Sequence, residues 1–530
     1  MDLAFLRGAR RRAPVAETHV GAPSRPGTRS APGTSSLAHQ AARGAIWTVL
    51  TSMGGRSIGV IGTLVMTRFL HPAQIGEVSD AVIIVMTANW ISIWGFGQYA
   101  VVKGRGADAA EVTWHATVAY MTVGAVALGL VALFGGRLLP FFGAPHAAAY
   151  VAPMALAIYI RRLGAMPERV LSRELRFRAA GVATIAGELA YTVSALALAA
   201  AGYGGWSIVL ANLVQSVVVV AILICAAGFA SWATPTPLRW ARFRDMLRFG
   251  LPLGIQNFAH GASRYWDNLA ISHFFGVGAV GAYNMAYNLA DIPATQVGEQ
   301  VSMVLMPSMA KLPPERRPAA LERATALLSL IIFPLAVGLG LVAHPLIALI
   351  LPSNAWQLVA PLLVVLACVS VFRPIMWVLS AYLEAESKTC RLMFLELAKV
   401  VLLIGGIAVL QRFGIRAASG AVGVAFGATA IAGIVLVARA TGEAGRPGPS
   451  PRRLLVAFFQ PLVACLVMAG TALGASELLA LAGIAHPAIH LAAMIAAGAV
   501  AYVAAAFVVC RATARDLLDL VRKARARRTA

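Results

Sequence analysis

The stretch SRYWDNLAISHFFGVGAVG, Ser263 to Gly281, places an arginine and an aspartate, Arg264 and Asp267, among mostly apolar and aromatic residues. Charged residues make up 12% of the whole chain and hydrophobic residues 59%, whereas soluble proteins carry roughly 25% charged residues. A charged side chain at the centre of a membrane-spanning helix costs ~2.5–3.5 kcal/mol. Arg264 and Asp267 are therefore expected to face a water-filled cavity or a partner rather than lipid.

Apolar runs of about the length that a helix needs to cross a bilayer, ~20 residues, recur along the chain. They predict an all-α polytopic membrane protein of about fourteen transmembrane helices, rather than a set of soluble domains. Charged residues, Pro or Gly separate the runs. The expected spans are 44–67, 79–101, 112–134, 147–165, 179–201, 206–229, 248–274, 281–308, 322–343, 356–380, 390–411, 417–438, 454–475 and 487–510.

The 44 lysines and arginines alternate between dense and sparse loops when these spans are threaded through a membrane. The loops on one side hold only Arg68, Arg137, Arg412 and Arg416. Because Lys and Arg concentrate on the cytosolic side, both termini are predicted to be cytosolic. The same rule accounts for the net charge of +22, so no nucleic-acid partner is expected.

A short internal similarity divides the chain into two halves. TRFLHPAQIG, Thr67 to Gly76, resembles SHFFGVGAVG, Ser272 to Gly281, at an offset of 205 residues. Each stretch leads from one span into the next at the same face of the membrane. Spans one and seven therefore run in the same direction, which predicts two parallel six-helix bundles around a central cavity, plus two C-terminal helices.

The chain is accordingly expected to have five parts. They are a disordered basic cytosolic tail (1–43), an N-lobe (44–232), a C-lobe (245–440), the last two helices (453–511) and a basic C-terminal cytosolic tail (512–530). The last part fits either an amphipathic helix on anionic lipid or a plain solvated tail.

Three of the expected spans carry polar residues every three or four positions, which places these residues on one helical face. We expect the three faces to line the cavity. Arg offers forked donors that match phosphate oxygens, so basic groups in the cavity suit an anionic substrate. The stripes are Thr48, Ser52, Arg56, Thr63 and Thr67; Asn257, His260, Arg264 and Asp267; and Asn284, Asn288, Asp291, Thr295, Glu299 and Ser302.

Some charged residues inside the spans also have a purely structural interpretation. Arg264 and Asp267 are three residues apart and can neutralise one another on one helical face. Lys399 and Glu396 have the same spacing in the eleventh span. Either pair could join helices without touching a substrate.

Three further residues leave alternatives open. Glu188 is either a proton or cation site or a hydrogen-bonded buried acid. His260 is either a switch or a hydrogen-bonded interior histidine. Arg373 precedes Pro374, which would kink the tenth span near the cavity.

Motifs for common catalytic and metal sites are absent from the sequence. It contains neither GxxxxGK[ST] nor HExxH, so it carries neither a P-loop nor this metalloprotease signature. The five cysteines are scattered, without CxxC pairs or Cys/His ligand spacing. We therefore expect no enzyme activity, no metal site and no cofactor.

The segment from Leu247 to Leu312 resembles the polysaccharide transporter family, which belongs to the multidrug/oligosaccharidyl-lipid/polysaccharide flippase superfamily. The resemblance covers residues 44–105 and 245–365 best. RFLHPAQIGEVSDA in the first half and AHPLIALILPSNAW after the ninth span are similar to further family motifs. The elements that carry it are Gly250-Leu251-Pro252, Asp267-Asn268-Leu269 before Gly276, Gly281-Ala282-Tyr283-Asn284 with Ala286, Pro293 and Pro307.

This resemblance implies export by alternating access. The implied cargo is a polyprenyl-diphosphate-linked oligosaccharide for O-antigen (lipopolysaccharide), exopolysaccharide or capsule synthesis. Glycosyltransferases and a polymerase would be pathway partners, and the protein would act as a monomer. The alternatives are a cation-coupled drug or metabolite exporter of the same superfamily and a flippase for a peptidoglycan-precursor lipid.

The resemblance also assigns candidate roles to residues. Arg56 and Arg264 become candidate phosphate ligands, and Asp267 and Asp291 become tuning or ion-coupling acids. The full set of candidate substrate-binding residues is Arg56, Arg264, Asp267, Asn257, His260, Asn288, Asp291, Glu299 and Lys399, and the candidate ion-coupling residues are Asp267, Asp291 and Glu188.

Overall fold

The computed structural model describes residues 47, 51, 53–104, 108–174, 176–293, 295, 298, 305, 308–309, 312–351, 355–386, 388–442, 449–484 and 486–529. Helices and turns account for their regular structure, and none of these residues lies in a strand. The expected tail 1–43 falls outside them.

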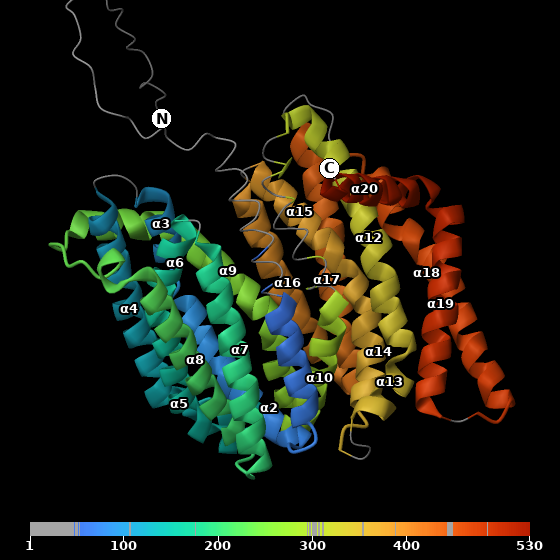
Figure 1. The fold of residues 1–530 in the computed structure, drawn as a ribbon, viewed down its shortest axis with the longest axis horizontal. Coiled ribbons are helices and arrows are strands. Elements are labelled where there is room, and N and C mark those ends of the chain that lie inside the picture. The colour runs from blue at the N-terminus through green and yellow to red at the C-terminus, as the bar shows by residue number, and fades with distance from the viewer. Residues whose placement is uncertain are drawn as a thin grey trace, which may run out of the picture. The chain divides into compact units, whose positions relative to one another are not determined.

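Figure 1 shows the α-helices that the structure describes beyond residue 70. They are α2 (Pro72–Ile91), α3 (Phe96–Lys103), α4 (Ala109–Phe134), α5 (Ala148–Leu163), α6 (Ala165–Arg173), α7 (Phe177–Ala200), α8 (Trp206–Ala227), α9 (Trp240–Phe275), α10 (Val277–Pro293), α12 (Arg317–Leu341), α13 (Ala343–Ile350), α14 (Val359–Val369), α15 (Arg373–Ala385), α16 (Thr389–Leu410), α17 (Ile415–Gly442), α18 (Pro451–Leu481), α19 (Pro487–Val509) and α20 (Arg511–Thr529). A further apolar helix, Met53–Met66, precedes them.

Nine helices within the described ranges are long and apolar enough to cross a membrane. A tenth span arises if α2 and α3, which meet at a bend of 43°, are taken together. The prediction of an all-α polytopic membrane protein is therefore confirmed, whereas the number of fourteen spans stays a prediction. The nine are Ala109–Arg137, Phe177–Ala200, Trp206–Ala227, Pro314–Leu341, Val359–Ala385, Cys390–Phe413, Ile415–Ala438, Pro451–Leu481 and Pro487–Val509.

The expected spans 44–67, 147–165, 248–274 and 281–308 coincide with helices that are shorter or more polar. They correspond to the helix Met53–Met66, α5, α9 and α10, and the end of span 281–308 lies outside the described residues. Three of these four carry the predicted polar stripes. Polar side chains that face a cavity lower the mean hydropathy of the helices that line it.

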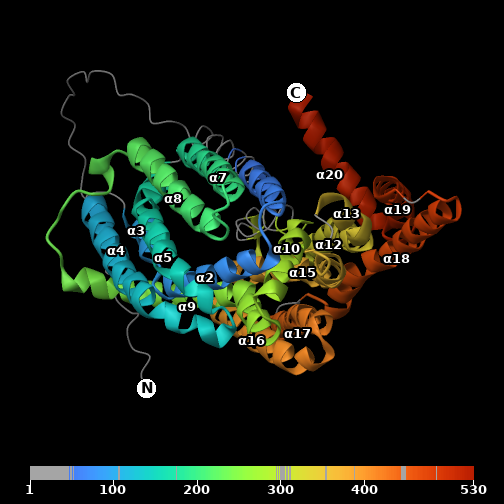
Figure 2. The ribbon, with the colours of Figure 1, turned by 90° about the horizontal axis from the view of Figure 1, so that it is seen from below.

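The helices pack as two groups joined by a few central elements. In the first group α7 packs on α8, α8 on α5 and α5 on α4; in the second, α16 packs on α17, and α14 contacts both α12 and α17. The pair α18 and α19 is attached through α12. Figure 2 shows α2, α9 and α10 between the two groups, and α2 contacts both α9 and α10.

The beginnings of α2 and α10 cross at very short range. An ideal Cβ atom on Gly76 would lie 2.0 Å from the carbonyl oxygen of Val277, and one on Gly281 would lie 1.8 Å from the carbonyl oxygen of Pro72. Only glycine fits such an approach of two backbones. Pro72 and Val277 are equivalent positions at the 205-residue offset, and so are Gly76 and Gly281. Each half therefore contributes the same glycine and the same carbonyl group to the crossing.

Hydrogen bonds extend this crossing. The amide of Asn284 donates to the hydroxyl of Ser79 at 3.2 Å, and these positions are again 205 residues apart. The hydroxyl of Ser272 in α9 donates to the buried carboxylate of Asp80 in α2. The two halves are thus joined at the ends of α2, α9 and α10 that are predicted to face away from the cytosol.

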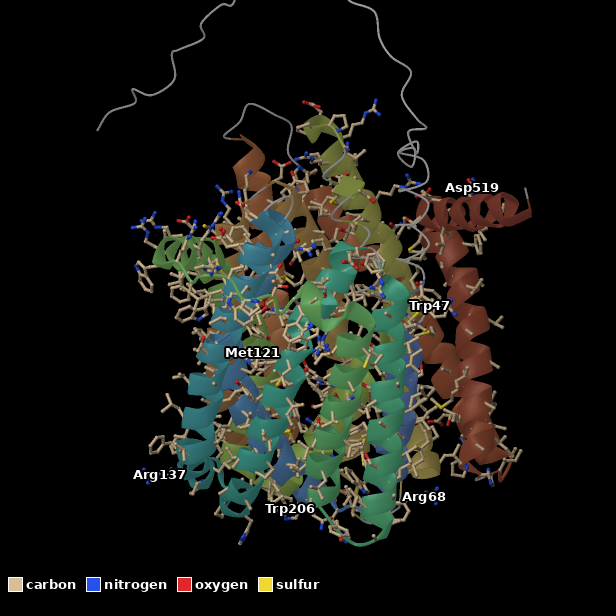
Figure 3. All side chains as sticks on the ribbon, turned by 60° about the vertical axis from the view of Figure 1, so that its left-hand side comes forward. Trp47, Arg68, Met121, Arg137, Trp206 and Asp519 are labelled. Carbon is tan, nitrogen blue, oxygen red and sulfur yellow. The ribbon has the colours of Figure 1, made fainter. Side chains whose placement is uncertain are left out.

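The labelled side chains in Figure 3 fit the two predicted faces. Arg68 and Arg137 lie at one end of the helices, and Asp519 in α20 lies at the other. Residues 512–529 of the predicted tail lie in α20, which runs across the ends of its neighbours (Figures 1 and 3). An ion pair between Arg323 and Asp516 holds α20 to α12. Which end faces the cytosol stays a prediction.

Candidate functional site

Three cavities lie toward the end of the helices that is predicted to face the cytosol. The central cavity, about 370 Å³, lies between the helix Met53–Met66, α9 and α10. The C-lobe cavity, about 250 Å³, lies among α9, α10, α15, α16 and α17. The N-lobe cavity, about 370 Å³, lies among α2, α4, α5, α6, α7 and α8. All three are on the same side of the α2–α10 crossing.

The central cavity brings together the three predicted polar stripes. Arg56 comes from the helix Met53–Met66, Arg264 from α9 and Asn288 from α10. Each of these helices packs its apolar face on its own bundle, so its polar face is left to line the space between them. Two guanidinium groups from different halves of the chain therefore line one space.

Arg264 and Asp291 also line the C-lobe cavity, so they form a wall shared by both spaces. Arg264 donates to the Asp291 carboxylate at 2.8 Å. Arg373 forms an ion pair with the same carboxylate. The side chains of Asp291 and Arg373 are only 9% and 8% exposed, whereas that of Arg264 is 29% exposed. Arg264 is thus the member of the cluster that water and ligands can reach.

The expected neutralisation of Arg264 by Asp267 is wrong. Asp267 is buried and accepts hydrogen bonds from the Tyr283 hydroxyl at 2.7 Å and from the backbone amide of Asn268 at 2.9 Å. Residues three apart on a helix diverge by about 60° around its axis. That rotation turns Asp267 toward α10 while Arg264 faces the cavities, and Asp267 lines none of the three.

The other predicted pair, Lys399 with Glu396, forms in α16 at 2.7 Å. The hydroxyl of Ser263 donates to the same carboxylate at 3.3 Å, and the Nδ1 atom of His260 lies 3.9 Å from it. His260 is exposed, and both it and Lys399 line the C-lobe cavity, as does Asn257. This cluster links α9 to α16.

Arg373 is part of the ion cluster around Asp291, a role that its sequence context did not predict. A 3₁₀ turn, Ser370–Phe372, lies between α14 and α15 directly before Arg373, within the span Val359–Ala385, and the kink at Pro374 stays a prediction. The guanidinium of Arg373 lies 4.8 Å from the ring centre of Tyr287 and 5.2 Å from that of Phe426. The sequence indicated a role for Arg373 only through its position beside a proline in an apolar span. Its acidic partner, Asp291, lies 82 residues away on α10 and could not be identified from that position.

Glu188 lies in the N-lobe cavity rather than with the arginines of the central one. Its carboxylate accepts a hydrogen bond from Gln215 at 2.9 Å. Its Oε2 atom would lie 3.3 Å from a Cβ atom on Gly59, and Gly59 lines the central cavity. Only the helix Met53–Met66 therefore separates the two spaces at this point.

The remaining chemistry of the chain is limited. Glu299 falls outside the described residues. No cluster of three or more His, Cys, Asp or Glu that could hold a metal occurs in the portion of the chain that the structure describes. The pattern Gly-x-Ser-x-Gly occurs at residues 55–59, but it lies inside the helix Met53–Met66 rather than at the strand-to-helix turn on which hydrolases use it.

A family model described as "polysaccharide biosynthesis protein" matches residues 65–361 of the chain. The chain is 26% identical over 324 residues to the succinoglycan biosynthesis transport protein ExoT of Rhizobium meliloti, a match that covers 61% of this chain but only 64% of that relative's length. It is 23% identical over 404 residues to the lipopolysaccharide biosynthesis protein WzxC of Escherichia coli, covering 74% of this chain and 78% of the relative.

Among solved structures, the fold is similar to that of the lipid II flippase MurJ in an inward closed conformation. The superposition has a TM-score of 0.69 and covers 89% of this chain and 100% of the other, at 12% sequence identity. An identity this low supports a shared fold and nothing further. The likeness agrees with the predicted all-α polytopic membrane fold.

Proposed function

We propose, from the premise that this chain belongs to the polysaccharide biosynthesis protein family, that it moves a polyprenyl-diphosphate-linked oligosaccharide across the bacterial inner membrane. The cargo would be a building block of a surface polysaccharide. The protein would move the cargo across the membrane without altering the cargo's covalent structure. The family membership and the names of the two relatives support this function.

The observation that carries the proposal is the meeting of Arg56 and Arg264 in the central cavity. They come from equivalent first helices of the two halves, and each offers a planar fork of donors. A diphosphate between them would receive hydrogen bonds from both halves at once. The lipid tail would stay in the bilayer while the charged headgroup crosses in water.

The α2–α10 crossing is the barrier in this scheme. It closes the cavities at one end, while the three cavities lie toward the other end. Alternating access then requires the crossing to separate after the cargo has bound. Asp267, Asp291 and Glu188 are the acids that we propose for ion coupling, because each lies inside the helical bundles.

The cargo's chemistry also defines the neighbouring steps. Glycosyltransferases must build the lipid-linked glycan on the cytosolic face, and a polymerase must consume it on the other. We propose that the protein acts as a monomer with both termini in the cytosol. A cationic drug is a poorer fit to a central cavity in which Arg56 and Arg264 face one acid, Asp291.

The test is the rate at which the purified protein in liposomes flips a fluorescent polyprenyl-diphosphate oligosaccharide. We expect Arg56→Ala and Arg264→Ala each to lower the rate about tenfold or more, since a hydrogen bond to a charged group contributes ~1.5–3 kcal/mol. Arg264→Lys should recover part of it, because it keeps the charge and loses the fork.

Arg68→Ala is the matched control, because Arg68 is an exposed arginine that follows the same first helix at its other end. It should flip cargo at the wild-type rate. Wild-type rates in both Arg56→Ala and Arg264→Ala would show that these residues do not hold the diphosphate.

A further inference from the structure

The N-lobe cavity contains three arginines, and one of them is fixed in place. Arg162 is 3% exposed. Its Nε atom donates to the Asn89 side chain at 2.9 Å, and its terminal nitrogens donate to the carbonyl oxygens of Tyr120 at 3.0 Å and Asn89 at 3.1 Å. With a further bond to the Ser92 hydroxyl, four of its five donors are engaged by residues 89–92 and by Tyr120, so it contributes a fixed charge to the cavity wall.

The other two arginines are exposed within the same cavity. Arg161 ends α5 and Arg169 lies in α6, and both line the space. Neither forms an ion pair within the described part of the chain. The acids that face them are Glu168, which is exposed, and Glu188, which accepts from Gln215. Three positive groups thus face two negative ones.

The C-lobe cavity shows the opposite pattern. There Lys399 is paired with Glu396, and Arg264 and Arg373 share Asp291. Unpaired cationic donors for a ligand are therefore a feature of the N-lobe side among the described residues. A carboxylate or phosphate group is the ligand that matches two guanidinium forks.

The N-lobe cavity also lies beside the site proposed for the diphosphate. The Oε2 atom of Glu188 would lie 3.3 Å from an ideal Cβ atom on Gly59 of the helix Met53–Met66, and Arg56 of the same helix lines the central cavity. A glycan attached to a diphosphate at Arg56 would reach this second space by extending past the helix Met53–Met66. The two sites are thus positioned to bind different parts of one molecule.

We propose that Arg161 and Arg169 bind an acidic group of the glycan, and that the preferred cargo is an acidic lipid-linked oligosaccharide. This inference rests on the proposed function. Binding of one carboxylate by two exposed arginines adds affinity for the acidic cargo over its neutral counterpart. The two arginines would then determine specificity, while Arg56 and Arg264 would bind every diphosphate-linked cargo.

The test compares two probes on the full-length protein in phosphatidylcholine nanodiscs. One probe is a polyprenyl-diphosphate disaccharide that ends in glucuronic acid, and the other ends in glucose. We expect the wild type to bind the acidic probe about tenfold more tightly, which corresponds to about 1.4 kcal/mol. The double variant Arg161→Gln/Arg169→Gln should bind both probes equally, at the wild-type affinity for the neutral one.

Arg137→Gln is the matched control, since it removes an exposed arginine at the opposite end of the same half, and it should keep the tenfold preference. Arg161→Lys/Arg169→Lys should keep part of it. These lysine variants and the unfolding temperature separate lost recognition from lost folding, because a misfolded variant would also lose the neutral probe.

Equal binding of both probes by the wild type would overturn this inference and leave the proposed function intact. Failure of both probes to bind would overturn the proposed function as well. The cavity would instead be a site for a phospholipid headgroup if the double variant lost bound phosphatidylglycerol in nanodiscs that contain it while keeping its preference for the acidic probe.

Discussion

At the scale of single residues, the cluster of Arg264, Asp291 and Arg373 decides how the cavity presents its charge. One carboxylate holds two guanidinium groups, and only Arg264 is substantially exposed. A negatively charged cargo can compete with Asp291 for Arg264, whereas Arg373 stays buried against Tyr287 and Phe426. Asp291 therefore sets both the orientation of Arg264 and the amount of charge that the cargo meets.

We expect Asp291→Asn to destabilise the protein, because it leaves Arg373 buried without its acid. Breaking a buried ion pair costs about 3–5 kcal/mol. The double variant Asp291→Asn/Arg373→Met should recover much of the loss, since the one charge then left without its acid is that of Arg264, which is partly exposed. Thermal unfolding of the purified variants measures both effects, and an unchanged unfolding temperature in Asp291→Asn would contradict this account.

The same cluster marks the limit of prediction from sequence at this scale. Spacing placed Arg56, Arg264 and Asn288 on cavity-facing stripes, and they do line one cavity. It paired Arg264 with its helical neighbour, because the rotation of α9 relative to α10 cannot be read from one helix. The pair within α16 was predictable since both partners share that helix.

At the scale of elements, the crossing of α2 and α10 is one of the closest backbone approaches between the halves. Gly281→Ala would place a methyl carbon about where the backbone of Pro72 lies. We expect this change to push the two helices apart and to open the cavities at that end. Gly278→Ala is the matched control, because a Cβ atom on Gly278, in the same helix, meets nothing within 4 Å.

The readout is the labelling of Asn284→Cys by a membrane-impermeant maleimide, in a background from which the five native cysteines are removed. Asn284 hydrogen-bonds across the crossing, so its replacement reports on separation. Labelling should rise several-fold with Gly281→Ala and stay at the background rate with Gly278→Ala. Equal labelling in both would mean that the crossing is not the barrier.

The individual helices also show why some spans are easier to predict from hydropathy than others. Helices that line none of the three cavities, such as α18 and α19, are recognisable from hydropathy alone. Helices that line the cavities mix polar and apolar faces, and α9, which carries Arg264 and Asp267, is not recognisable in this way. Their existence was nevertheless predictable from the period of their polar residues.

At the scale of the whole molecule, the two halves must separate at one end and approach at the other. Ser79 and Asn284 lie at equivalent positions and contact each other directly. Cross-linking Ser79→Cys to Asn284→Cys should reduce flipping in liposomes to background, and a reducing agent should restore it. Each single-cysteine variant under the same oxidant is the control, and normal flipping by the cross-linked protein would exclude an opening at this point.

The glycine crossing has a consequence for how the chain came to have two halves. Contacts that recur with the partners exchanged are what an isologous dimer presents at its symmetry axis. Gly76 with Val277 and Gly281 with Pro72 form such a set within one polypeptide. One half alone would thus already have a surface complementary to a second copy of itself. Within the joined chain, a larger residue at either glycine position would require the backbone of the other half to move.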